Sequence, residues 1–453
     1  MPPRLPVVAR YVAVHAEPGS LALAERVPGT YEGAVVVPAR NEAPAMLEGL
    51  APALAGRDAL AIVVVNGDAN DDPSTVAANA TLLAALRGSG ERTEVAPGVE
   101  HIRRCHGALL LVDRASGPRR IAVGQGVGRA RRIGCDLALC LWQLGKVRRR
   151  FIDTTDADVT LPPGYFDAAP ADCVAFTRAF VHVPSGDEAL DRATALYELT
   201  LRYYVAGLTI AGSPWAMHTI GSCISVDAEA YAAVRGVPLR AAGEDFYLLA
   251  KVAKLGPVAV ERGGPICVAS RRSRRVPFGT GPGVAKIEAG LAIGETPTVY
   301  CPSSFAALAA VHGALQRWAA AEEPTGPDLG GHDTGLAAAL EELGVAAGVV
   351  AAVRGAKHPA QRRRRVAEWF DAFRTLKLVH ALRRHGRHDV PWPEAVAALS
   401  RAPHTDNVAV ALEMLKTLHN PSTPAGYHAE ATSPAATAEA QTFGRSLSDP
   451  DSF

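Results

Sequence analysis

The sequence predicts an α/β protein whose sheet is mostly parallel and flanked by helices, with an additional helical region towards the C-terminus. Residues 34–37 and 61–65 are continuous apolar runs, and each ends in a polar loop that precedes helical periodicity. Such runs are typical of strands buried in a parallel sheet, and their alternation with helices predicts right-handed βαβ units. Residues 303–418 are rich in Ala, Leu, Glu and Arg with helical spacing, which predicts the second region.

The whole chain has the composition of a globular protein. It has 453 residues, 48% of them hydrophobic, and its 47 basic and 46 acidic side chains give a formal net charge of +1. This balance lacks the basic excess of nucleic-acid-binding proteins, so we expect no nucleic acid partner. Seven cysteines without a C-x-x-C pair favour a reducing compartment, so we expect the protein to be cytoplasmic.

Composition shifts along the chain predict its organisation. We expect an N-terminal extension at 1–30, an α/β domain at 31–295, a helical region at 300–418 and a disordered tail at 419–453. Within the extension, residues 10–15 are a candidate edge strand. The longest uncharged stretch, residues 203–226, is interrupted by glycines and a proline, so we expect no transmembrane segment. Residues 362–365 are all arginine and could contact a membrane surface peripherally, although such runs are more often solvated.

The remaining elements of the α/β domain follow in chain order. Besides the two strands above, we predict strands at 108–112, from residue 151, and near 173–176. Helices are predicted at 76–86, from about 124 to 144, from about 188 to 206, at 227–234, and from residue 243 onward. In such a sheet, ligands bind beyond the carboxyl ends of the strands, where the polar loops lie.

Asp156 and Asp158 are the central candidates for a metal site. They follow a short strand and are two residues apart, so in an extended chain both side chains project from the same face. Hard cations such as Mg²⁺ or Mn²⁺ prefer oxygen ligands, and Mg²⁺ is usually bound by one or two carboxylates together with substrate phosphates. The alternative interpretation is an ordinary polar loop.

A glycine run at residues 124–128 opens the helix before this pair. It lacks the third glycine of G-x-G-x-x-G in either register, which disfavours a dinucleotide site. Arg129 or Arg132, at the start of the helix, is instead available to a phosphate group.

Two further charged segments lie downstream. Glu244 and Asp245 fall in the first turn of a predicted helix, where acidic side chains also simply complement the helix dipole. Residues 270–275 carry four arginines and precede a glycine-rich loop. Guanidinium groups match phosphate oxygens, so these arginines could clamp a diphosphate, although most such clusters are solvated.

Taken together, these segments resemble the inverting glycosyltransferases of family 2, over roughly residues 33–283. The resemblance lies in the order and spacing of six motifs: VVVPARNE at 35–42, VVVNGDANDD at 63–72, GRARRIGCDLAL at 128–139, TDAD at 155–158, GSCISVDAEAY at 221–231 and GED at 243–245. It implies the GT-A fold and metal-dependent transfer of a sugar from a UDP- or GDP-linked donor to an acceptor hydroxyl, with inversion. One departure is Asn66, which stands where the family commonly has a carboxylate.

The resemblance also implies roles for single residues. The nucleotide would contact Pro38, Ala39, Arg40, Glu42, Asn66, Asp68, Asp71, Arg129 and Asp156. Asp156 and Asp158 would hold Mg²⁺ or Mn²⁺, and the diphosphate would meet Arg271, Arg272, Arg274 or Arg275. Asp245 would be the catalytic base, with Glu244 as the weaker candidate. Trp215 and His218 are candidates for the acceptor side, with core packing as the alternative for Trp215.

Three other functions remain open on the sequence. A retaining transferase would use the same nucleotide and metal loops but lack a base at Asp245. A nucleotidyltransferase would need a glycine-rich, lysine-containing loop after the first strand, and residues 39–42 do not form one. A non-enzymatic scaffold that binds nucleotide sugars could use the helical region as its interaction module.

Overall fold

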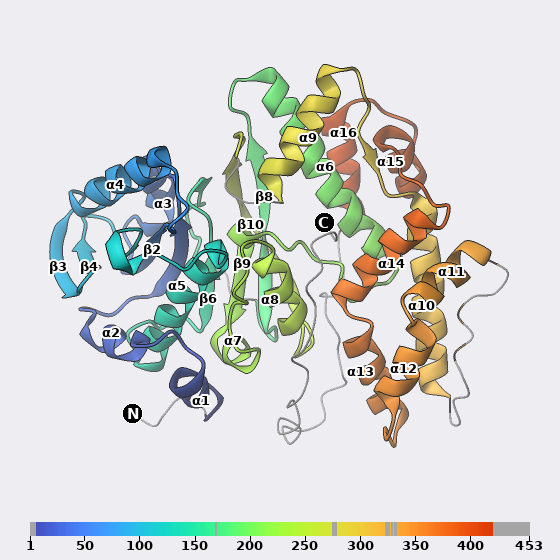
Figure 1. Ribbon diagram of the computed structural model, residues 1–453, viewed down its shortest axis with the longest axis horizontal. Coiled ribbons are helices and arrows are strands. Elements are labelled where there is room, and N and C mark those ends of the chain that lie inside the picture. Colours follow the sequence, from blue (N-terminus) through green and yellow to red (C-terminus); the bar gives the residue numbers. More distant parts are fainter. Residues whose placement is uncertain are drawn as a thin grey trace. The chain divides into compact units, whose positions relative to one another are not determined.

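The computed structural model describes residues 6–167, 170–273, 279–321, 327, 329 and 333–419, with only the backbone described at residue 262. These residues belong to two compact units (Figure 1). Unit 1 takes its residues from Met1–Glu198 and Met217–Ala292, and unit 2 takes its residues from Leu199–Ala216 and Ile293–Phe453. The short segment Leu199–Ala216 therefore leaves the α/β region and packs with the C-terminal helices.

A ten-stranded sheet forms the centre of the described part of unit 1, in the order β3-β4-β5-β2-β1-β6-β9-β8-β10-β7. Its strands are β1 (Gly33–Ala39), β2 (Ala59–Asn66), β3 (Glu91–Ala96), β4 (Val99–Arg103), β5 (Ala108–Arg114), β6 (Phe151–Thr154), β7 (Val159–Thr160), β8 (Ala175–Val183), β9 (Ile224–Asp227) and β10 (Val258–Ala269). Strands β5, β2, β1 and β6 are parallel to one another, and β8 is parallel to β10.

The expected mostly parallel sheet is confirmed, with exceptions that the sequence did not reveal. Strand β9 runs antiparallel between β6 and β8, and β7 pairs antiparallel with β10. Strands β3 and β4 form a hairpin at one edge. Four of the six residues of β3 in a row are exposed, so the hairpin lacks the apolar run that marks a buried strand.

Helices cover both faces of the central strands. In Figure 1, α3 (Met46–Leu54) and α4 (Pro73–Arg87) lie on one side of β2, and α2 (Ser20–Arg26) and α5 (Gly126–Gln143) lie on the other. The α3 and α4 side is a continuous core that includes Leu50, Leu54, Leu82 and Val63. Further described α-helices of unit 1 are α7 (Ala228–Ala233), α8 (Glu244–Val252), α9 (Thr280–Ala292), the first part of α6 (Glu188–Ile210) and, at the N-terminus, α1 (Pro6–Val14).

The N-terminal residues are helical, so the prediction of an edge strand at 10–15 is wrong. They form α1 (Pro6–Val14), in which Val8 and Tyr11, three residues apart, are buried on one face. The hydroxyl group of Tyr11 donates a hydrogen bond to Asp136 on α5 at 2.7 Å, as does the hydroxyl group of Tyr231. Asp136 also accepts from the backbone N–H of Glu17 at 2.8 Å, which fixes the link between α1 and α2 onto α5.

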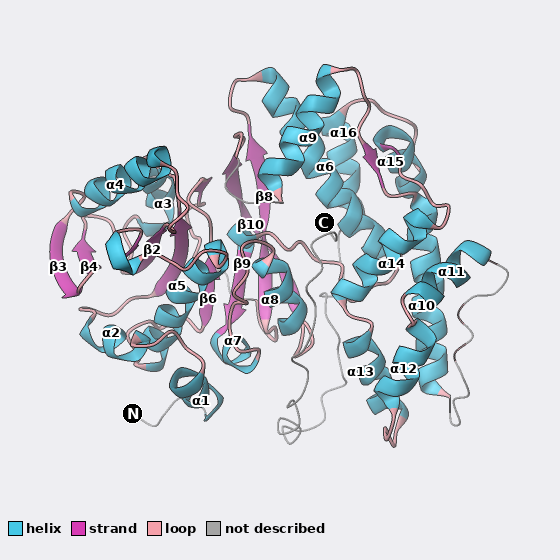
Figure 2. Cartoon of the chain, in the orientation of Figure 1, coloured by secondary structure: helices cyan, strands magenta, loops and turns pink. Residues whose placement is uncertain are grey.

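The described residues of unit 2 are helical apart from loops and one short strand pair (Figure 2). Its described helices and strands are β11 (Thr298–Val299), α10 (Pro302–Ala320), α11 (Thr334–Glu342), α12 (Val345–Val353), α13 (Pro359–Trp369), α14 (Ala372–Arg384), β12 (Val390–Pro391), α15 (Trp392–Ser400) and α16 (Val408–Leu418). Arg362, the first residue of the four-arginine run, is buried and donates to the carbonyl oxygen of Ala319 at 3.1 Å.

The structure also bears on membrane spans and on the predicted tail. No single described helix is long and apolar enough to cross a membrane, whereas α11 and α12 meet the length and composition test only as a pair, bent by 55°. The predicted tail lies outside the described residues, apart from His419.

Candidate active site

The first two polar loops meet at the carboxyl edge of the sheet. Strands β1 and β2 pair in parallel up to Ala39 and Val65, so Arg40 and Asn66 follow at neighbouring positions. Arg40 forms ion pairs with Asp71 and, at 3.5 Å, with Asp68. The structure thus brings together the predicted nucleotide residues of both loops. Pro38 and Ala39, also predicted there, are buried at the end of β1.

Asn79 on α4 holds these two loops together, a role that was not predicted from the sequence. Its side-chain oxygen accepts from the backbone N–H of Asn41 at 2.9 Å, and its amide group donates to the carbonyl oxygen of Asn66 at 3.1 Å. The side chain is buried, and a buried amide needs such partners. The sequence signal for this role is a polar residue, Asn79, on the apolar face of the helix predicted at 76–86.

The acidic pair lies beside the first loop. Strand β6 pairs with β1, and the backbone N–H of Thr155 donates to the carbonyl oxygen of Val36 at 2.9 Å, so Asp156 and Asp158 emerge at the same edge. Arg271 donates to Asp158 at 2.7 Å and to both oxygens of Glu42 at 2.7 and 2.8 Å. Burial raises the pKa of Asp158 and the charge of Asp156 adds to this, although Arg271 opposes the shift.

Arg131 forms a second bridge between acidic side chains, and it was not among the site residues predicted from the sequence. Its guanidinium group pairs with Asp156 at 2.7 Å and with Glu244 at 3.0 Å. It also donates to the carbonyl oxygen of Gly221 at 3.1 Å. Burial alone would lower the pKa of Arg131, but Asp156 and Glu244 raise it above its ordinary value. The sequence signal for a buried Arg131 is its helical spacing. Cys135 and Ala138, four and seven residues further on, lie on the same face of the helix and are both buried.

Asp245 faces the same cluster from the first turn of α8. A methyl group at Gly221 would lie 2.6 Å from Arg131 Nη2 and 3.4 Å from Asp245 Oδ2, so both side chains border that glycine. Asp245 is half-buried. Burial, followed by the charge of Glu244, raises its pKa to about 7, while Arg131 acts in the opposite direction.

The other predicted site residues lie elsewhere or are not described. Arg129 pairs with Glu17 at 2.7 Å, and Arg272 is largely exposed and pairs with Asp187 at 2.9 Å.

Trp215 is buried in unit 2, where its indole N–H donates to the carbonyl oxygen of Phe370 at 3.0 Å. This is the packing role that the sequence left as the alternative. His218 is buried in unit 1, with its ring 5.2 Å from that of Phe180. Arg274 and Arg275 lie outside the described residues.

The two aspartates fit a divalent cation only in combination with a ligand. Among the described residues, no group of three or more His, Cys, Asp and Glu side chains could hold a metal ion. Two carboxylates are nevertheless the usual protein share of a Mg²⁺ site, in which phosphate oxygens and water complete the coordination. The side chains of Asp156 and Asp158 are 38% and 19% exposed, so both can be reached by an incoming diphosphate.

The fold and site together define a class of protein: a mixed α/β protein with an acidic, arginine-bridged site at the carboxyl edge of its sheet. No family model matches the chain, and no curated protein matches it. Among solved structures, it is similar to the mannosyltransferase PcManGT from Pyrobaculum calidifontis in complex with GDP-Man and Mn²⁺. That likeness has a TM-score of 0.32 at 16% identity and covers 91% of each chain.

Proposed function

We propose that the protein is an inverting glycosyltransferase that moves a sugar from a nucleoside-diphosphate donor to an acceptor hydroxyl group. One observation carries the proposal. The two arginine bridges, Glu42–Arg271–Asp158 and Asp156–Arg131–Glu244, join the first nucleotide loop, the acidic pair and the segment of the candidate base into one cluster. These are the parts that transfer from a sugar nucleotide requires in one place.

The leaving group is the diphosphate, and its negative charge must be stabilised as the bond to the sugar breaks. Asp156 and Asp158 would hold Mg²⁺ or Mn²⁺, which supplies charge neutralisation when it is bound with the diphosphate. Arg271 already lies between Asp158 and Glu42, so its guanidinium group can turn to phosphate oxygens without leaving the site. Arg131, whose own side chain is buried, keeps Asp156 in position through an ion pair.

Asp245 would act as the general base. The acceptor oxygen forms its bond to the anomeric carbon while the bond from that carbon to the diphosphate oxygen breaks, and the hydroxyl proton passes to the Asp245 carboxylate. A single displacement of this kind inverts the configuration. Glu244 is buried against Arg131 and has a positioning role in this scheme, because its carboxylate is already paired.

The activity should depend on pH through Asp245. A general base must be unprotonated to act. The pKa of Asp245 is raised to about 7, so activity should be lost on acidification near neutral pH, whereas an ordinary aspartate would lose it near pH 4. We expect kcat/KM to fall by about tenfold per pH unit well below pH 7 and to level off above it. Initial rates measured in buffers of constant ionic strength test this. A profile that stays flat from pH 5 to pH 7 would contradict the assignment of Asp245.

Nucleotide binding is the decisive test of the proposed function. Calorimetric titration with UDP and GDP, each with and without Mn²⁺, should show metal-dependent binding of at least one nucleotide. The variant Asp156→Ala with Asp158→Ala should lose it, since the cation then has no carboxylate ligand. The matched control, Glu94→Ala with Glu394→Ala, removes two exposed carboxylates and should bind as the wild type does. Absence of binding by any nucleotide would leave a non-enzymatic scaffold as the better interpretation.

A further inference from the structure

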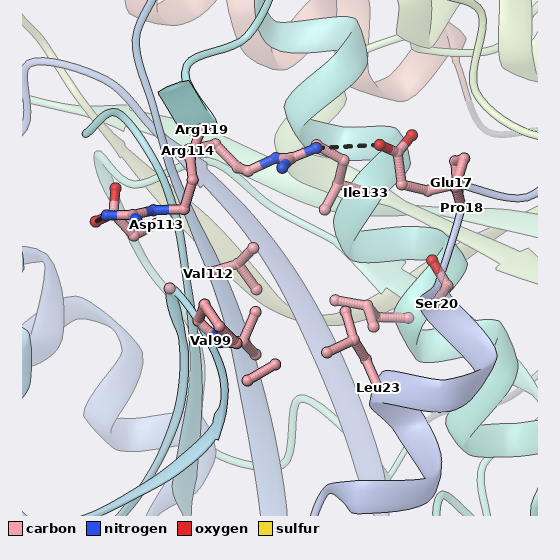
Figure 3. A pocket seen from close by; sticks show the side chains of 14 residues that line it. Glu17, Pro18, Ser20, Leu23, Val99, Val112, Asp113, Arg114, Arg119 and Ile133 are labelled. Atoms are coloured by element: carbon pink, nitrogen blue, oxygen red, sulfur yellow. Dashed lines mark hydrogen bonds and ion pairs between the residues drawn. The ribbon is translucent and has the colours of Figure 1, made fainter. Parts of the chain in front are cut away.

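A pocket of about 130 Å³ lies in unit 1 on the face of the sheet that α5 covers. Its apolar wall includes Val99, Val112, Ile133 and Leu23. Figure 3 shows the Arg114 side chain extending toward Glu17 above Val99, Val112 and Leu23, and the two charged groups pair at 3.1 Å. The pocket is smaller than the roughly 300–1,000 Å³ of a complete ligand site, so it would hold one part of a ligand, and its ionic rim above an apolar wall resembles the mixed lining of ligand pockets.

The pocket adjoins the proposed nucleotide site. Arg114 is the register partner of Asn66, and the backbone N–H of Gly67 donates to the carbonyl oxygen of Arg114 at 3.1 Å. Glu17 is also paired with Arg129, two residues before Arg131 on the same helix. Arg129 and Arg131 are two residues apart and therefore project from different sides of α5, so the link between the pocket and the nucleotide site rests on the pairing of Arg114 with Asn66. Because Arg114 lines the pocket and neighbours Asn66 in the sheet, the pocket borders the second loop of the proposed nucleotide site.

The rim has a specific hydrogen-bonding pattern. The Glu17 side chain is only 11% exposed and already pairs with Arg114 at 3.1 Å and Arg129 at 2.7 Å, but a carboxylate has about four lone-pair sites, so it can accept further N–H groups beside the Arg114 donors. The Nε atom of Arg114 is buried and has no hydrogen-bond partner in the part of the chain that the structure describes, so this guanidinium group keeps an unused donor that a shift of the side chain would present to a ligand acceptor. A matching ligand thus presents two adjacent N–H groups to the carboxylate and an acceptor to the guanidinium group.

Guanine is the base with that edge. Its N1–H and exocyclic amino group are adjacent donors, and its O6 next to them is an acceptor. Uracil has a single N–H between two carbonyl groups, and adenine and cytosine each present one amino group beside an acceptor nitrogen. We propose that this pocket binds the base of the donor nucleotide and selects guanine, with Glu17 and Arg114 contacting its hydrogen-bonding edge. The inference rests on the proposed function and narrows its donor to a GDP-linked sugar.

Inosine diphosphate gives the sharpest test, because it differs from GDP only in lacking the exocyclic amino group. In calorimetric titrations with Mn²⁺, the wild-type protein should bind GDP about ten- to a hundredfold more tightly than inosine diphosphate and UDP. In Glu17→Gln the ratio of GDP to inosine diphosphate affinity should approach one. In Arg114→Met both purine nucleotides should weaken together and keep their ratio, because both retain O6.

The design separates a folding defect from a lost contact. The ratio is measured within one preparation, so a change in the folded fraction leaves it unaltered. Glu25→Gln is the matched control, since Glu25 lies on α2 with an exposed side chain, and it should keep the wild-type ratio. Two results would overturn the guanine assignment alone, provided that metal-dependent nucleotide binding is observed. One is a wild-type protein that binds GDP and inosine diphosphate equally tightly. The other is a preference for GDP over inosine diphosphate that persists in Glu17→Gln. No nucleotide binding at all would overturn the proposed function and this inference with it.

Discussion

Replacing Asp245 by Asn is expected to lower the rate of sugar transfer by about 10²- to 10⁴-fold. The amide keeps the size of the side chain but cannot take the acceptor proton. Nucleotide affinity should stay close to the wild-type value, because Asp245 is not among the residues that would hold the donor. Single-turnover rates and calorimetric titration of the same variant measure the two effects separately.

The remaining activity of Asp245→Asn should also lose its dependence on pH near neutrality, because the group with a pKa of about 7 is gone. Asp172→Asn is the matched control: Asp172 is exposed and has a positive φ of 53°, which asparagine tolerates. A variant at Asp245 with wild-type kcat and an unchanged pH profile would show that another group accepts the proton, and a product with retained configuration would point to the retaining mechanism.

Arg131→Met is expected to destabilise unit 1 by about 3–5 kcal/mol, because it leaves the buried Glu244 carboxylate without its cation. The free energy of unfolding from urea titration measures this. Exposed ion pairs contribute far less, so Arg148→Met, which changes an exposed arginine shortly after α5, should shift the unfolding free energy by less than about 1 kcal/mol. Equal losses in the two variants would show that the Arg131 bridge does not stabilise the fold.

The same substitution has a second, electrostatic consequence. The positive charge of Arg131 lowers the pKa of Asp245, so its removal should raise that pKa further. A base with a higher pKa needs a higher pH to be unprotonated, so the acidic limb of the rate profile should move to higher pH in Arg131→Met. A purely structural role would lower stability and leave the midpoint of that limb in place.

Much of the site could be predicted because its residues follow local signals. Asn66 comes directly after an apolar run that becomes β2, Glu42 lies in the polar loop three residues after the end of β1, and Asp156 and Asp158 follow the short strand β6. Glu244 and Asp245 begin α8 as predicted. Strand ends and helix starts are set by residues close in sequence, so the polar residues at these positions could be assigned to one edge of the sheet from the chain alone.

The sequence could not distinguish between chemically identical neighbours. Arg129, Arg131 and Arg132 are three arginines on one helix turn, yet they contact Glu17, the Asp156–Glu244 pair and the carbonyl oxygen of Val237 respectively. Arg271 and Arg272 are adjacent, yet only Arg271 reaches the acidic pair, while Arg272 pairs with Glu288 and Asp187. The direction of each side chain follows from helical phase or strand alternation relative to the rest of the unit.

By itself, the sequence of this protein determined that the apolar runs at 34–37, 61–65 and 108–112 become buried strands, which polar loops follow the first two and which acidic residues those loops carry, because near neighbours in the chain dictate these features. Only the tertiary structure decided that Arg131 and Arg271 bridge those acids, that residues 6–14 are helical and fixed to Asp136, and that Glu17 lies at a pocket beside Asn66. These pairings join residues up to 229 positions apart, and their formation depends on how the strands and helices pack rather than on any local pattern.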